Sequence, residues 1–77
     1  MDILITTPLH NRRGFYTALS ARLCPDESPI TNADALADVL RSNHVEHVVA
    51  SDWQLDLREE LILLAVFKDL GISLRFA

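Results

Sequence analysis

The sequence predicts a small α/β protein with three helices and a three-stranded parallel sheet, in the order β-α-α-β-α-β. Short apolar segments rich in β-branched residues lie near the start, in the middle and at the end of the chain. Longer segments between them repeat apolar residues three and four positions apart, as helices with one buried face do. Because helices separate the strands, the connections must be crossovers, which favour parallel pairing. The 77 residues make a single domain, residues 1–77.

The first strand and the first helix are predicted within residues 1–30. Residues 3–7, ILITT, form a strand that ends before a proline. Asn11 can cap a helix from Arg12 to about Leu23. The apolar face of this helix consists of Phe15, Leu19 and Leu23. Residues 24–30 contain two prolines and form a loop.

Residues 31–42, TNADALADVLRS, carry the clearest helical pattern in the chain. Thr31 or Asn32 can cap the first free backbone N–H groups. An apolar stripe follows, made of Leu36, Val39 and Leu40. This stripe predicts that the helix packs one face against the core.

Asp34 and Asp38 lie one turn apart on the other side of this predicted helix. One interpretation is a solvated face, because Asp34 is favoured by the helix dipole and Asp38 can pair with Arg41. The second interpretation is that two carboxylates are displayed to a cationic partner.

The last three elements follow in the second half of the chain. Residues 46–50 and 72–76 are predicted strands. Asp56 can cap a helix that runs to Leu70, and Gly71 is typical of the left-handed residue that closes a helix. Residues 61–67 of this helix are apolar on all sides. Because a helix of this kind is usually buried, we expect this segment to lie in the core.

The distribution of charge predicts the kind of partner. The formal net charge is −4, and residues 1–23 hold three arginines against one aspartate. The acids Asp26, Glu27, Asp34 and Asp38 lie in residues 24–40, which contain no Lys or Arg. A surface of this sign repels nucleic acid and attracts basic proteins, so we expect a basic protein partner and no nucleic acid.

The sequence lacks the patterns of several enzyme and metal sites. It has no Gly-rich phosphate loop, nucleophile elbow or metal-ligand spacing, and its single cysteine excludes an internal disulfide. His44 and His47 should point to opposite faces at the start of a strand, which does not suit a shared metal ion. Polar residues at the ends of strands, such as Ser51 and Asp52, are interpreted as strand caps rather than as parts of a ligand site. We therefore expect no catalytic residues, no metal and no cofactor. The longest apolar run, residues 61–67, is too short to span a membrane, and we expect a cytoplasmic protein.

A resemblance to a known family appears in residues 32–40. The segment N-A-D-A-L-A-D-V-L resembles N-L-D-A-L-W-D-C-L of the barstar-like ribonuclease inhibitors, with six of nine positions in agreement. Asp52-Trp53 resembles the Glu-Trp pair that follows the second strand of that family. Residues 66–69, VFKD, resemble a V-F-R-E stretch in its last helix. The family has the same element order.

The resemblance implies a non-enzymatic inhibitor of a ribonuclease or toxin, an immunity or antitoxin role. Family members fill the cationic cleft of a ribonuclease with acidic side chains. Matched by position, Asp38 would enter the phosphate site of the enzyme and Asp34 would make the other acidic contact on the helix. Asn32 matches the asparagine before them, and Asp26 and Glu27 flank the segment in the preceding loop.

The sequence departs from the family at the aromatic contacts. Ala37 stands where the family has a tryptophan, and residues 26–31 replace a loop with paired tyrosines. Aromatic side chains are often binding hot spots, so we expect a basic partner other than barnase, the ribonuclease target of that family. The alternative is a small interaction or homo-oligomerisation module that uses the apolar third helix. In that case we expect a homodimer that the substitution Leu63→Glu dissociates.

Overall fold

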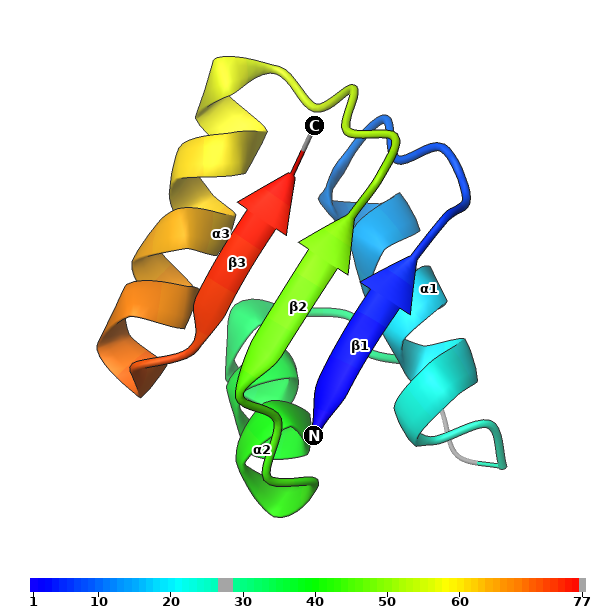
Figure 1. The fold of residues 1–77 in the computed structure, drawn as a ribbon, viewed down its shortest axis with the longest axis vertical. Coiled ribbons are helices and arrows are strands. Elements are labelled where there is room, and N and C mark those ends of the chain that lie inside the picture. The colour runs from blue at the N-terminus through cyan, green and yellow to red at the C-terminus, as the bar shows by residue number, and fades with distance from the viewer. Residues whose placement is uncertain (27–28, 77) are drawn as a thin grey trace.

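The predicted element order is confirmed. The computed structural model describes residues 1–26 and 29–76. Its elements are β1 (Asp2–Ile5), α1 (Arg12–Leu23), α2 (Ala33–Ser42), β2 (His47–Ala50), α3 (Leu57–Leu70) and β3 (Ser73–Phe76). The three strands form one parallel sheet in the order β1-β2-β3 (Figure 1).

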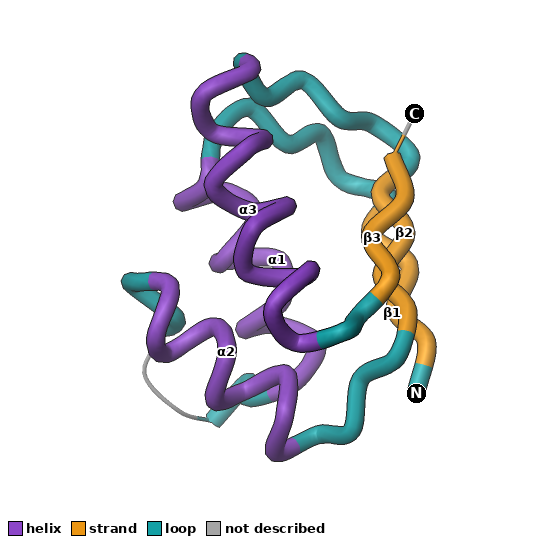
Figure 2. The backbone as a smooth tube through the Cα atoms, turned by 90° about the vertical axis from the view of Figure 1, so that its left-hand side faces the viewer, coloured by secondary structure: helices purple, strands orange, loops and turns teal. Residues whose placement is uncertain are grey.

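The molecule has two layers, because all three helices lie on one side of the sheet (Figure 2). Ile3 pairs in register with Val48, which pairs with Leu74, and these side chains belong to the core beneath the helices. Leu4 and Val49 alternate with them and remain 50% and 39% exposed. Parallel sheets are usually covered on both faces, so the open face is a distinctive feature of this fold.

The strands are shorter than the sequence predicted. β1 ends at Ile5 rather than at residue 7, because the chain then turns to bring Leu9 beside Trp53 in an isolated parallel bridge. The Leu9 N–H donates to the Asp52 carbonyl oxygen at 3.0 Å. β2 and β3 each begin one residue later than predicted, at positions 47 and 73.

Aromatic side chains fill the core where the helices meet the sheet. Phe15 packs edge-to-face against both Trp53 and Phe67, with ring centroids 5.9 Å apart in each pair. Trp53 also stacks on Phe76 at 4.4 Å, and its indole N–H donates to Glu60 Oε1 at 3.0 Å. The indole therefore has an apolar body in the core and a partner for its polar end.

Caps fix the ends of the helices. The side chains of Asn11 and Asp56 accept hydrogen bonds from the third residues of α1 and α3, at 2.8 and 2.9 Å. Both caps agree with the prediction. Gly71 closes α3 with φ +69°, as the sequence indicated.

Replacing Gly71 with alanine is expected to destabilise the protein by about 1–2 kcal/mol. An added Cβ would meet no atom within 4 Å, so the cost is the left-handed backbone alone. Chemical denaturation measures the change. Gly71→Asn should recover part of the loss, because asparagine tolerates this conformation; equal losses for both variants would contradict the explanation.

The expected burial of α3 is correct for one face only. Leu63 and Phe67 are fully buried, whereas Leu57 is 67% exposed and Leu61 is 55% exposed. In a two-layer molecule each helix has an outer face, and nothing among the described residues covers this one. Because Leu63 is buried, Leu63→Glu would disrupt the core rather than test a dimer.

Candidate functional site

The outer face of α2 presents the two aspartates that the sequence singled out. Leu36 and Leu40 are fully buried, which anchors the opposite face of the helix. Asp34 and Asp38 are both exposed. The predicted ion pair between Asp38 and Arg41 is absent, since the ion pairs among the described residues do not include it. Both carboxylates are therefore available to a partner.

Asn32 is the N-cap of α2, and its role is structural in this state. Its Oδ1 accepts a hydrogen bond from the Ala35 N–H at 2.8 Å. Thr31 is not the cap. The side chain of Asn32 is exposed, so its amide NH2 group can still face a bound partner.

Replacing Asn32 with alanine is expected to lower the free energy of unfolding by about 1 kcal/mol, because a free N–H of α2 loses its acceptor. Asn32→Asp should retain most of the stability, since aspartate caps equally well. Urea denaturation of the two variants and the wild type measures both values. Equal destabilisation by alanine and aspartate would show that the cap is not the cause.

The loop before α2 is tied to α1 by a buried serine. Ser20 Oγ donates to the Tyr16 carbonyl oxygen and accepts from the Ile30 N–H, each at 2.8 Å. This contact fixes the point from which the chain enters α2. Asp26 is exposed near the end of α1, and Glu27 lies outside the described residues.

A cleft that the sequence did not predict lies between the helices. It has a volume of about 780 Å³ and is bordered by the first residues of α1, by the entry to α2 and by the first turn of α3. Its lining residues include Arg12, Arg13, Tyr16, Thr17, Thr31 and Glu59. It places cationic groups next to the acidic helix.

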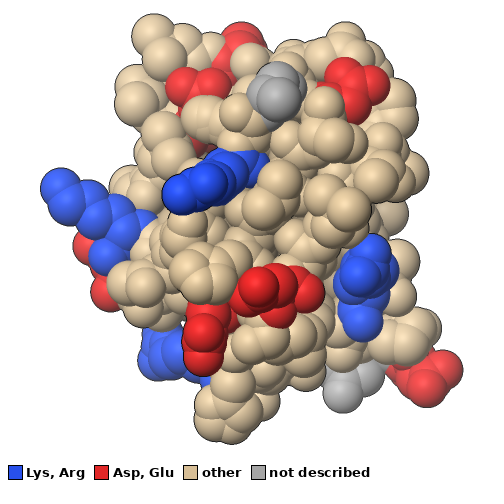
Figure 3. Space-filling model, in the orientation of Figure 1, with Lys and Arg blue, Asp and Glu red and all other residues tan. Residues whose placement is uncertain are grey.

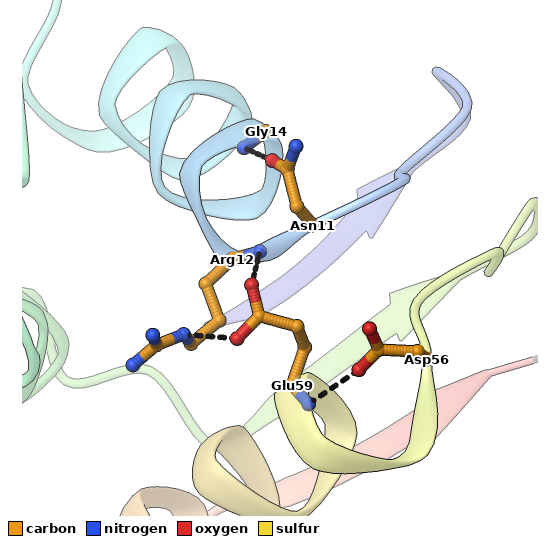
Figure 4. Close-up of polar contacts among 5 residues, drawn as sticks. All are labelled: Asn11, Arg12, Gly14, Asp56 and Glu59. Carbon is orange, nitrogen blue, oxygen red and sulfur yellow. Dashed lines mark hydrogen bonds and ion pairs between the residues drawn. The ribbon is translucent and has the colours of Figure 1, made fainter.

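Arg12 and Glu59 join two of these elements (Figure 4). Arg12 Nε forms an ion pair with Glu59 Oε2, and the Arg12 backbone N–H donates to Glu59 Oε1 at 3.4 Å. Glu59 thus supplies the negative charge that the first turn of α1 lacks. The two residues are 47 positions apart, and no local signal in the sequence relates them.

A second group of polar side chains lies where the sheet begins. Asp2, Glu46 and His47 are exposed, and their potential ligand atoms all lie within 4.8 Å of one another. Asp2 and His47 are register partners on the open face of the sheet. These side chains could hold a divalent cation, but exposed groups of this kind are common without one. Figure 3 shows acidic and basic side chains dispersed over this face.

Of the polar residues at the strand ends, Ser51 bonds the backbone of a neighbouring strand as predicted, whereas the side chain of Asp52 contacts another side chain. The Ser51 N–H donates to the Ile5 carbonyl oxygen at 3.0 Å, and its hydroxyl reaches the same oxygen at 3.4 Å. Asp52 Oδ1 accepts from Gln54 Nε2 at 2.8 Å. Cys24 is a buried free thiol at the C-terminal end of α1.

Comparison with protein-family models, curated proteins and solved structures found no match. Among the described residues, none of the helices combines the length and the apolar character needed to cross a bilayer.

Proposed function

We propose that this chain is a non-enzymatic inhibitor that docks on a basic protein through α2, in the manner of the barstar-like ribonuclease inhibitors. The observation that carries the proposal is the pair of exposed carboxylates of Asp34 and Asp38 on a helix whose opposite face is anchored in the core. Neither carboxylate has an ion-pair partner among the described residues. Two fixed negative charges one turn apart suit a cleft that binds phosphates.

The fold is compatible with the family resemblance. The element order, the parallel sheet and the position of the 32–40 segment on an exposed helix agree with what the resemblance implies. Ala37 is half-buried on α2 and supplies no aromatic contact. The partner that we propose is therefore a basic ribonuclease or toxin of the same cell, whose surface does not require that anchor.

Affinity capture from the lysate of the source organism tests this proposal. The baits are the wild type, Asp34→Asn/Asp38→Asn, and the control Asp2→Asn/Glu46→Gln, which removes the same charge from exposed positions at the start of the sheet. We expect the wild type and the control to retain a basic nuclease or toxin that the α2 variant loses. Identical capture by all three baits would contradict a role of α2.

The exposed leucines of α3 favour a second candidate, self-association through this helix. Leu57 and Leu61 are one turn apart and more than half exposed. Light scattering coupled to size exclusion can detect a homodimer, which Leu61→Glu would dissociate. Leu4→Glu, on the open sheet face, serves as the control. A monomeric wild type would exclude this candidate.

A further inference from the structure

The cleft between the helices contains two arginines, of which only Arg12 is paired with a carboxylate of the described residues. Arg12 is paired with Glu59 through its Nε atom, and Figure 4 shows its two terminal amino groups pointing away from that carboxylate. Arg13 is exposed and takes part in none of the ion pairs among the described residues. Several guanidinium donors therefore border the cleft without an acceptor in the part of the chain that the structure describes.

Glu59 offsets the charge of Arg12, but among the described residues nothing offsets the charge of Arg13 at this end of α1. Both arginines lie in the first turn of α1, which has no acidic residue, and cations at this end of a helix are destabilising. The entry to α2 borders the same cleft, so the positive end of a second helix adds to the field. An anion in the cleft would be attracted by the two arginines and by the two helix ends, against the repulsion of Glu59, which lines the cleft, and of Asp34 in the first turn of α2.

The size and the lining of the cleft limit the class of ligand. A volume of about 780 Å³ exceeds the space that a single inorganic anion needs and lies in the range of small-molecule sites. Tyr16, Pro29 and Ile30 contribute apolar surface, whereas Thr17 and Thr31 contribute hydroxyl groups. A phosphorylated small molecule combines the charge and the apolar body that such a lining accommodates.

We propose that this cleft binds the phosphate group of a small phosphorylated ligand, with Arg13 and the free amino groups of Arg12 as its main donors. Arginine is suited to this role because its planar guanidinium group gives phosphate two parallel hydrogen bonds. The site uses residues other than Asp34 and Asp38, so it does not depend on the proposed inhibitor function.

A titration of the purified protein at low ionic strength tests the proposal. The probes are inorganic phosphate and adenosine 5′-monophosphate, and binding is measured by two-dimensional NMR of the backbone amides. We expect saturable shifts in residues 11–17 and 29–33. Tighter binding of the nucleotide than of inorganic phosphate would support a phosphorylated organic ligand, whereas equal affinities would show that the apolar lining contributes nothing and would overturn that part of the proposal.

Arg13→Gln is expected to weaken this binding by about tenfold or more, because a charge-assisted contact to phosphate is lost. Arg75→Gln, an exposed substitution on the open sheet face, should bind like the wild type. Both variants remove a solvent-exposed charge, so we expect both to fold, which circular dichroism checks. Equal weakening by the two substitutions, or the absence of saturable binding of either probe, would overturn the proposal.

Discussion

Replacing Asp34 and Asp38 with asparagine is expected to weaken binding of the basic partner by at least about 2–5 kcal/mol, or roughly 30- to 5000-fold in Kd. Each carboxylate is exposed in the free protein and would become buried against a cation in the complex. Its removal leaves the cation of the partner desolvated and unpaired. The single substitutions should each account for part of the loss, and their sum need not equal that of the double variant.

The stability of this variant should change little, by less than about 1 kcal/mol. The substitution removes the repulsion between two carboxylates at i, i+4 and the favourable contact of Asp34 with the helix dipole, two small effects of opposite sign. Isothermal titration calorimetry and urea denaturation measure the two quantities on the same samples. A folded variant that binds the partner as the wild type does would show that the carboxylates are only a solvated face.

Replacing Phe67 with alanine is expected to destabilise the protein by about 3–5 kcal/mol. Phe67 is 1% exposed and packs edge-to-face on Phe15, which in turn contacts Trp53. Natural domains are stable by only about 5–15 kcal/mol in total, and a chain of this length lies at the marginal end. The variant should therefore be largely unfolded at 37 °C.

Thermal melting followed by circular dichroism measures this effect. Leu61→Ala on the same helix is the matched control. Because Leu61 is 55% exposed, this substitution removes apolar atoms without opening a cavity. We expect its free energy of unfolding to remain within about 1 kcal/mol of the wild type. Similar melting temperatures for the two variants would contradict the assignment of Phe67 to the centre of the core.

The parts of the fold that could be predicted from the sequence are those with local causes. Asn11 and Asp56 begin helices because their side chains accept hydrogen bonds from residues three positions later. Gly71 ends α3 because it adopts a left-handed backbone. The element order followed from these signals together with the apolar patterns, and the parallel pairing followed from the need for crossover connections.

Features that depend on contacts between residues far apart in the chain could not be predicted from the sequence. β1 ends early because Leu9 is drawn into a bridge with Trp53, a partner 44 positions away. The sequence pattern of α3 also could not show which of its apolar side chains the two-layer arrangement leaves exposed. Leu61 and Leu63 have the same apolar character, yet only one is buried.

The same distinction applies to the candidate sites. The exposure of Asp34 and Asp38 followed from the apolar stripe on the other side of α2, which is a local pattern. The cleft did not, because it forms where three helices approach one another and where Glu59 contacts Arg12. The one local sign of the cleft in the sequence was the pair of arginines in the first turn of α1, because cations interact unfavourably with the helix dipole there.

The measurement that tests the inhibitor proposal most directly is a titration of the catalytic activity of the captured basic partner with this protein. We predict that activity falls linearly to zero at one equivalent of the wild type, and that Asp34→Asn/Asp38→Asn leaves most of the activity at the same concentration. A partner that remains fully active when saturated with the wild type, or that both proteins inhibit equally, would contradict inhibition through α2.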